Sequence, residues 1–203
     1  PIQWYQKIFR YQRCIVEQHD NFIKQTYRNR CVISATQGVQ ALSIPVEPAP
    51  QTSVNGKVAM KDVRISDHGN WRHLHWNALL SAYGESPFFE YYEDDIRPFF
   101  EKQYTFLFDF NMETTAKMCE LLDIEPNIVL SEEYLSADAL SQSSTNDVVR
   151  DFRDAIRPKR PLEDPEFSPK PYYQVFKQKH GFLPNLSILD LLFNEGNESV
   201  LFL

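Results

Sequence analysis

Residues 19–33 read HDNFIKQTYRNRCVI, and this stretch decides how the rest of the chain is interpreted. It holds the cations Lys24, Arg28 and Arg30 with no acid after Asp20, in a protein whose net charge is -7. The positions between the cations carry amide and hydroxyl donors, namely Asn21, Gln25, Thr26, Tyr27 and Asn29. A basic, donor-rich segment in an acidic chain predicts a local anion site rather than a general surface for polyanions.

The same stretch fits a strand better than a helix from Tyr27 onward, because residues 31–33 lead into a β-branched run. A repeat of two residues then places Lys24, Arg28 and Arg30 on one face. A helix would instead turn Arg30 away from the other two cations. A solvated edge strand that is blunted by its charges would carry the same pattern, so this alternative stays open.

Length and composition are those of an ordinary globular protein. The 203 residues suffice for one domain with a sizeable core, and 42% of them are hydrophobic and 24% charged. A pI near 5.3 excludes a broad basic face, so we expect no nucleic-acid partner. The scattered cysteines Cys14, Cys31 and Cys119 predict a reducing, cytoplasmic location, and no apolar run has the length of a membrane span.

Apolar periodicity predicts a single α/β domain over residues 1–203, with a mixed sheet early in the chain, packed helices and a helical tail. The expected helices are residues 2–12, 70–83, 87–100 with a break at Pro98, 111–122, 172–180 and a segment from 185 onward. The expected strands are residues 14–18, a hairpin at 31–46 with Gly38 at its turn, 58–65 and 127–130.

Other segments lack regular periodicity. Residues 140–151 are predicted to be polar and mobile, and residues 157–171, with five prolines, to be an extended loop. The chain begins at Pro1 without Met, so we expect a first strand before it that would complete a βαβ unit.

His19 and Asp20 are the acid–base candidates. They follow directly after the strand expected at residues 14–18, and α/β proteins place ligands at the carboxyl ends of strands. Histidine titrates near neutrality, which suits proton transfer, and Asp20 would orient the ring. A turn histidine bonded to its own backbone would give the same pattern, so both interpretations remain.

A second candidate group consists of Asn70, Trp71, Arg72 and His73. Asn70 is predicted to cap the helix at residues 70–83. Arg72 and His73 would then lie in its first turn, where the helix dipole favours anions. If this turn meets residues 19–33 in space, the two stretches would form one anion site.

Metal and cofactor signals are weak. His73 and His75 would lie about 200° apart on a helix, so they cannot chelate one ion, and we predict no metal site. His75 borders the apolar stripe of that helix, which is typical of a core histidine. The sequence has no Walker loop, dinucleotide fingerprint or nucleophile elbow, so it assigns no cofactor.

Several segments together resemble the WbqC-like protein family. They are PIQWYQKI at residues 1–8, HDNFIK at 19–24, YRNR at 27–30, NWR at 70–72 and PNLSILDLLFN at 184–194. The resemblance runs nearly end to end. It implies an association with bacterial O-antigen and related surface-polysaccharide genes, and transfer of glycine to a sugar as a suggested role. It assigns no catalytic residue, and the matching positions are Asn21, Lys24, Asn29, Arg30 and Trp71.

Three functions remain open. The first is an enzyme that transfers an aminoacyl or acyl group to a sugar or sugar nucleotide, with His19 as proton acceptor beside the cations. The second is a non-catalytic protein that holds a phosphorylated or nucleotide-linked ligand in the same cationic pocket. The third is assembly, in which the apolar tail docks on another subunit of an oligomer. A titratable group beside the cations would favour the enzyme, and cations without one would favour the binding protein.

Overall fold

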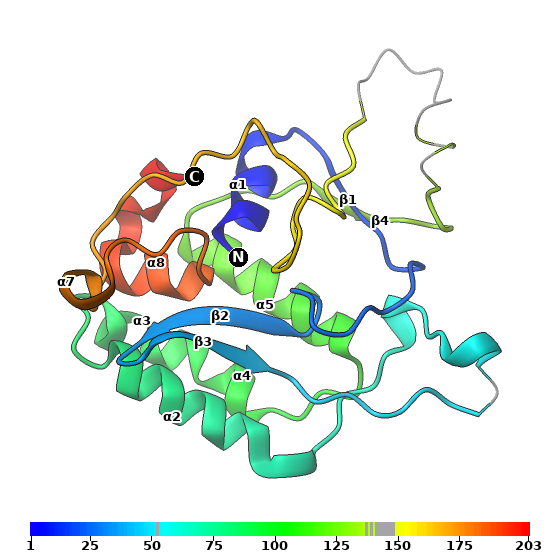
Figure 1. The fold of residues 1–203 in the computed structure, drawn as a ribbon, viewed down its shortest axis with the longest axis horizontal. Coiled ribbons are helices and arrows are strands. Elements are labelled where there is room, and N and C mark those ends of the chain that lie inside the picture. Colours follow the sequence, from blue (N-terminus) through cyan, green and yellow to red (C-terminus); the bar gives the residue numbers. More distant parts are fainter. Residues whose placement is uncertain (52, 137, 139, 141–148) are drawn as a thin grey trace.

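The computed structural model describes residues 1–51, 53–136, 138, 140 and 149–203. In this part of the chain the strands form two separate pairs. β1 (Cys14–Val16) runs parallel to β4 (Ile128–Leu130), and β2 (Arg30–Ala35) pairs with β3 (Gly38–Ser43) in antiparallel register. Parallel and antiparallel pairs among packed helices confirm the mixed α/β class, although no single sheet joins these four strands (Figure 1).

The β2–β3 hairpin lies at the centre, with α2 (Trp71–Tyr83) on one side and α1 (Ile2–Arg10) and α8 (Ile188–Glu195) on the other (Figure 1). Hydrogen bonds tie β2 to both layers. The Ser34 amide donates to the Tyr83 hydroxyl at 3.2 Å, and the Ser187 amide donates to the Val32 carbonyl at 2.7 Å. The hairpin predicted around Gly38 is confirmed, and the φ of 110° at Gly38 explains why glycine stands at the turn.

The described residues form further helices around the hairpin. They are α3 (Phe89–Ile96), α4 (Pro98–Glu101), α5 (Leu107–Leu121) and α7 (Lys177–His180), with 3-10 turns η1 (Val54–Gly56), η2 (Met60–Asp62), η3 (His68–Asn70) and η4 (Gly196–Phe202). The predicted break at Pro98 is confirmed. Proline starts α4 because its missing N–H costs nothing in the first turn of a helix.

Two apolar clusters fill the interior, and Phe100 packs against both. The larger cluster joins α1, the hairpin, α2, α3 and α8, and the smaller one surrounds Trp71 and Leu107. Leu191, Leu192 and Phe193 in the tail are fully buried. These three side chains of the tail are therefore packed within this chain.

Buried polar contacts connect the tail and the loop before it to the helices. The Asp190 carboxylate accepts the hydroxyls of Tyr83 at 2.7 Å and Tyr172 at 2.6 Å. The Lys7 side chain of α1 is buried and pairs with the buried Asp164 side chain at 2.7 Å. These contacts hold distant segments against α1 and α2.

Several expected boundaries are wrong. Residues 24–29 form turns, and β2 begins only at Arg30. Residues 58–65 form η2 and isolated bridges from Arg64 and Ile65 instead of a strand. α5 begins four residues earlier than expected, and α7 covers only the end of residues 172–180. The prediction for residues 140–151 falls mostly outside the described residues.

Candidate functional site

The predicted acid–base candidates follow β1, whose carboxyl end lies beside that of β4 because the two strands are parallel. Glu17 holds this edge together. Its Oε1 accepts the His19 amide at 2.7 Å and the Ser131 hydroxyl at 2.9 Å, and its Oε2 accepts the Leu135 amide at 2.7 Å. Burial alone would raise the pKa of Glu17, but these hydrogen bonds outweigh it and lower that pKa.

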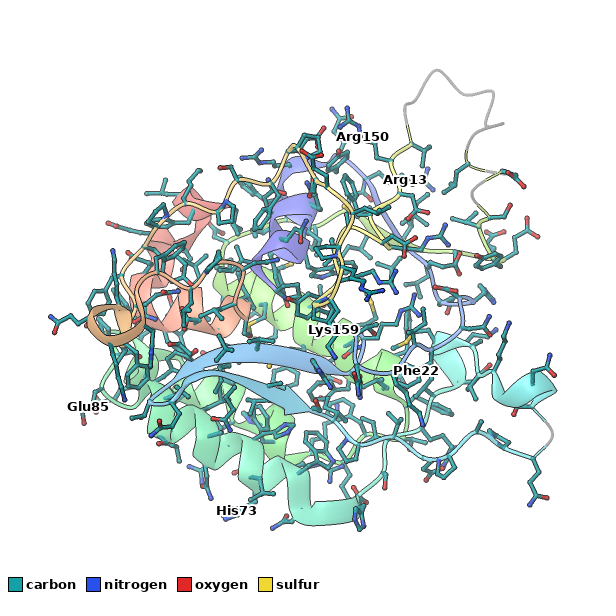
Figure 2. All side chains as sticks on the ribbon, in the orientation of Figure 1. Arg13, Phe22, His73, Glu85, Arg150 and Lys159 are labelled. Atoms are coloured by element: carbon teal, nitrogen blue, oxygen red, sulfur yellow. The ribbon has the colours of Figure 1, made fainter. Side chains whose placement is uncertain are left out.

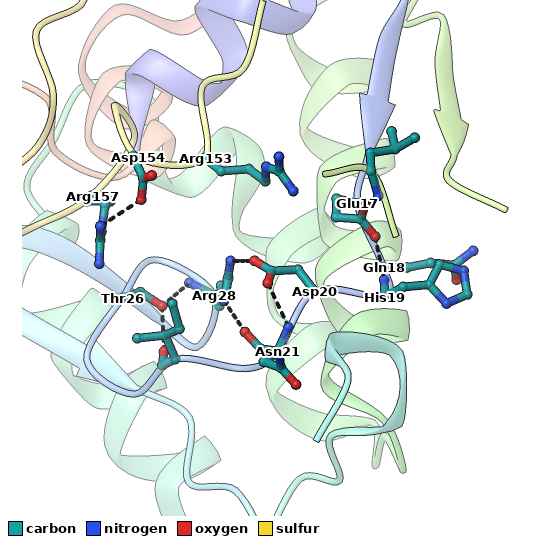
Figure 3. Close-up of polar contacts among 12 residues, drawn as sticks. Glu17, Gln18, His19, Asp20, Asn21, Thr26, Arg28, Arg153, Asp154 and Arg157 are labelled. Atoms are coloured by element: carbon teal, nitrogen blue, oxygen red, sulfur yellow. Dashed lines mark hydrogen bonds and ion pairs between the residues drawn. The ribbon is translucent and has the colours of Figure 1, made fainter. Parts of the chain in front are cut away.

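His19 does not meet Asp20 as an acid–base pair. Its Nε2 lies 3.2 Å from the Ser131 carbonyl, and Figure 3 shows the ring directed away from Asp20 and Arg28. The Asp20 carboxylate instead pairs with Arg28 and accepts the Asn21 amide at 2.8 Å. Asp20 is therefore engaged with the loop and does not orient the His19 ring.

Arg28 fastens its own loop. Besides its pair with Asp20, it donates to the Asn21 carbonyl, and its carbonyl accepts from Asn111 on α5 at 2.8 Å. Thr26 donates to the Ile23 carbonyl at 2.7 Å. These local bonds, with a left-handed backbone at Gln25 (φ 61°), break the two-residue repeat that a strand would need. The expected common face of Lys24, Arg28 and Arg30 is consequently absent.

The other binding residues predicted within residues 19–33 have different contacts in the structure. Asn29 donates to the Ile44 carbonyl at 2.9 Å and so ties the loop to the chain after β3. Burial raises the pKa of Tyr27, and nearby Cys31 adds to the effect. Arg30 has a buried Nε without a partner in the described part of the chain. Lys24 is exposed, and no ion pair joins it to another described residue.

Residues 153–157 lie near the same loop, and they were not predicted from the sequence to be part of this region. Arg153 pairs with Asp151, and Arg157 pairs with Asp154 at 2.7 Å (Figure 3). The side-chain hydrogen bond with Asp151 raises the pKa of Arg153, to which Asp20 also contributes. Five cations within residues 150–160 were a signal that could have found this segment. Because Arg28, Arg153 and Arg157 each have a carboxylate partner, most of their charge is neutralised internally.

The residues predicted as binding residues at the start of α2 lie in different environments. Asn70 is the N-cap residue of α2, as predicted, but its backbone is left-handed (φ 47°) and its side chain makes no capping hydrogen bond. Trp71 is only 4% exposed, and its Nε1 donates to the Ser66 carbonyl at 3.1 Å. Its ring packs edge to face with Phe110, which makes Trp71 a core residue rather than a ligand contact.

Asn70, Arg72 and His73 line a pocket of about 340 Å³ between the start of α2 and α4. The other lining residues are Trp76, Arg97, Phe100, Glu101 and Gln103. Its volume lies at the lower end of the range for small-molecule sites. The lining combines two guanidinium groups, two amides and two aromatic rings, which are suited to a polar ligand with a negative charge.

Arg72 is the best-anchored cation of this pocket. Its Nη1 donates to Asp67 at 2.6 Å, and its Nε donates to the Lys102 carbonyl at 3.2 Å. Its Nη2 is buried, and none of the described residues accepts a hydrogen bond from it. Arg97 donates to Glu101 at 2.8 Å, and both of these side chains are more than half exposed.

The histidines of α2 have separate roles. His73 is exposed, and its Nε2 lies 2.9 Å from the Asn77 amide nitrogen. Burial lowers the pKa of His75 to about 4, although a hydrogen bond with the Ser43 backbone opposes the shift, as expected of a core histidine. Within the described ranges, no group of three His, Cys, Asp or Glu side chains could hold a metal ion.

The two candidate regions do not meet. Lys159 contacts Gln25 of the loop at 3.2 Å, and Figure 2 shows Lys159 on one side of the hairpin and His73 on the outer side of α2. The expected single anion site is thus divided. One part is an internally paired loop around Arg28, and the other is the pocket at Arg72.

Fold and pocket together describe a mixed α/β protein with a small pocket lined by polar and aromatic side chains. The chain belongs to the WbqC-like protein family, whose model matches residues 1–156. It is also similar to the uncharacterized protein Rv1507c of Mycobacterium tuberculosis, with 28% identity over 195 residues, which cover 88% of this chain and 81% of the relative. No solved structure matches the chain. None of the helices in the described residues is long and apolar enough to cross a membrane.

Proposed function

We propose that this WbqC-like protein binds a phosphorylated or nucleotide-linked small molecule in the pocket at Arg72. The observation that carries the proposal is the buried Nη2 of Arg72, which has no acceptor among the described residues. A buried charged donor without a partner costs free energy, and a phosphate oxygen would supply the missing charge-assisted bond.

A second cation can join Arg72 at little cost. Arg97 lines the same pocket, and its pair with Glu101 is exposed to solvent. Exposed ion pairs contribute only about 0–1 kcal/mol, so an anion can compete with Glu101 for Arg97. Around the loop, by contrast, Arg28, Arg153 and Arg157 already have close carboxylate partners.

The resemblance to polysaccharide-associated proteins supports a more specific proposal about the ligand. We propose that the ligand is a sugar derivative used in bacterial surface-polysaccharide biosynthesis of the O-antigen type, in the cytoplasm. Binding is the core of the proposal, since His19, the group first expected to transfer protons, points away from the cations (Figure 3).

Transfer of an aminoacyl or acyl group, with glycine as one candidate, is the second function. His73 favours it, because an imidazole in the pocket lining can act as a general base. A sugar amine or hydroxyl would form the bond to the acyl carbon, its proton would pass to His73, and the donor's leaving group would depart with the electron pair. His73→Gln should then abolish transfer and preserve ligand binding.

A thermal-shift screen of sugar phosphates, nucleotide-sugars and aminoacyl donors tests the binding proposal. A ligand at a hundred times its Kd should stabilise the protein by about 2.7 kcal/mol. Arg72→Ala should remove the shift, and Lys24→Ala, an exposed lysine outside the pocket, should retain it. Shifts lost in Lys24→Ala and kept in Arg72→Ala would contradict the proposal and return the site to the loop.

A further inference from the structure

The wall of the Arg72 pocket is aromatic. Trp76 and Phe100 both line it, with ring centroids 5.8 Å apart and ring planes at 40°. Neither ring is fully buried, so part of each remains available to a ligand. The Arg97 guanidinium lies 5.9 Å from the Trp76 ring, which places a cation next to this wall. Apolar and cationic surface thus occur side by side within one small pocket.

The rest of the lining suits hydroxyl groups. Asn70 and Gln103 offer amide donors and acceptors, and the Glu101 carboxylate offers acceptors only. A pyranose ring presents an apolar face of C–H groups with hydroxyls around its edge, which matches an aromatic wall with a polar rim. The volume of about 340 Å³ is near the lower limit for ligand sites, which fits one sugar ring with its anionic group and leaves a nucleotide outside.

We infer that the pocket takes a monosaccharide carrying one phosphate monoester, with the phosphate at Arg72 and Arg97 and the sugar ring against Trp76 and Phe100. The inference rests on the proposed function for the anion and adds the sugar class. Arg72 lines the pocket, and its Nη2 has no acceptor among the described residues, so we place the phosphate at this guanidinium. Arg97 reaches it after leaving Glu101.

The same geometry indicates that Glu101 controls the affinity of the pocket for anions. It accepts from Arg97 at 2.8 Å and lines the pocket, so its negative charge competes with the ligand phosphate. Removing the charge in Glu101→Gln should raise affinity for anions several-fold. The same change should leave binding of a neutral sugar undetectable, because the anion supplies the main contact.

Isothermal titration of the intact protein with four probes tests the inference: glucose 1-phosphate, inorganic phosphate, glucose and UDP-glucose. Glucose 1-phosphate should bind about tenfold more tightly than inorganic phosphate, which corresponds to about 1.4 kcal/mol from the sugar. Glucose alone should give no heat, and UDP-glucose should bind no more tightly than glucose 1-phosphate.

Trp76→Leu separates the sugar from the anion. It should lower affinity for glucose 1-phosphate to that for inorganic phosphate, and leave phosphate binding as in the parent. Retained phosphate binding also reports that the variant pocket is intact. If Trp76→Leu disturbs folding, the four titrations of the parent and those of Glu101→Gln still decide the matter.

Three results would overturn the inference. Equal affinities for glucose 1-phosphate and inorganic phosphate would show that the sugar is not recognised, while anion binding would stand. Much tighter binding of UDP-glucose would show that the nucleotide is recognised. Absence of binding for every anion in both the parent and Glu101→Gln would remove the proposed function together with the inference.

Discussion

Asp20 forms its ion pair with Arg28, whereas the ring of the neighbouring residue, His19, contacts the Ser131 carbonyl. Arg28 also donates to the Asn21 carbonyl, so both of these contacts close the same loop. The Arg28 and Asp20 side chains are about four-fifths buried. A pair of this kind stabilises the turn that delivers the chain to β2, and it leaves His19 without a carboxylate from Asp20.

Arg28→Ala should therefore act on stability. We expect the free energy of unfolding to fall by about 1–3 kcal/mol, because Asp20 loses its partner in a mostly buried position. Lys24→Ala is the control, and an exposed side chain should change stability by less than about 0.5 kcal/mol. Urea unfolding measures both. An Arg28→Ala protein of parental stability that no longer binds phosphate would show that the loop is the anion site.

Lys7 and Asp164 are nearly inaccessible to solvent, so their pair should respond strongly to the loss of one partner. Lys7→Met should destabilise the protein by about 3–5 kcal/mol, because it leaves a buried carboxylate without its cation. Replacing both residues, as Lys7→Met with Asp164→Leu, should recover much of the loss. A double variant no more stable than Lys7→Met would mean that the charge of Asp164 is not what causes the loss.

Asp190 predicts a pH dependence of stability. Burial raises the pKa of this carboxyl above its ordinary value of 3.8, although its hydrogen bonds oppose the shift. A carboxyl with a higher pKa in the folded state stabilises the fold below its unfolded pKa, and this stability is lost as the pH rises through the folded pKa. The free energy of unfolding of the parent should thus fall relative to Asp190→Asn as the pH rises above about 4.

Glu17 should change the pH dependence of stability in the opposite direction. Its pKa is lowered in the folded state, so the stability it contributes is present above its ordinary value of 4.5 and is lost as the pH falls. The parent should accordingly gain stability relative to Glu17→Gln as the pH rises. Chemical unfolding across pH measures both differences, and equal slopes for the two variants would contradict the assignments.

The tail should be essential for folding. Ile188, Leu191, Leu192 and Phe193 are at least 96% buried, and each should contribute about 1.5–3 kcal/mol by burial. A chain that ends before Pro184 should lose its cooperative thermal transition and aggregate. A truncated protein that stays in solution and unfolds cooperatively would show that the tail is dispensable.

Local sequence chemistry predicted some elements well. Gly38 marks the turn of the hairpin, and Pro98 marks the break between α3 and α4, because each residue imposes its own backbone geometry. The failure at residues 24–29 has a local cause too, since Thr26 and Arg28 form side-chain bonds to the loop backbone that a two-residue repeat does not reveal. Secondary-structure propensity does not predict these hydrogen bonds.

The site was harder to predict because it depends on contacts between distant segments. Arg72 was identified from its place at the start of a helix, but its pocket also needs Arg97, Phe100 and Gln103 from the region of α4. Trp71 looked equally promising by sequence, and it is buried against Phe110 of α5. Two adjacent residues of one helix thus differ, because one is buried in the core and the other lines a pocket. The packing of α2 against its neighbours decides which is which.

Titration of the parent and of Arg72→Lys with glucose 1-phosphate tests the central claim most directly. Lysine keeps the charge of Arg72 but loses its planar set of donors, of which Nη1 and Nε hold the side chain and Nη2 has no acceptor among the described residues. The predicted result is a ten- to hundredfold loss of affinity, equivalent to about 1.5–3 kcal/mol. Equal affinities of the two proteins for glucose 1-phosphate would contradict the assignment of the site to Arg72.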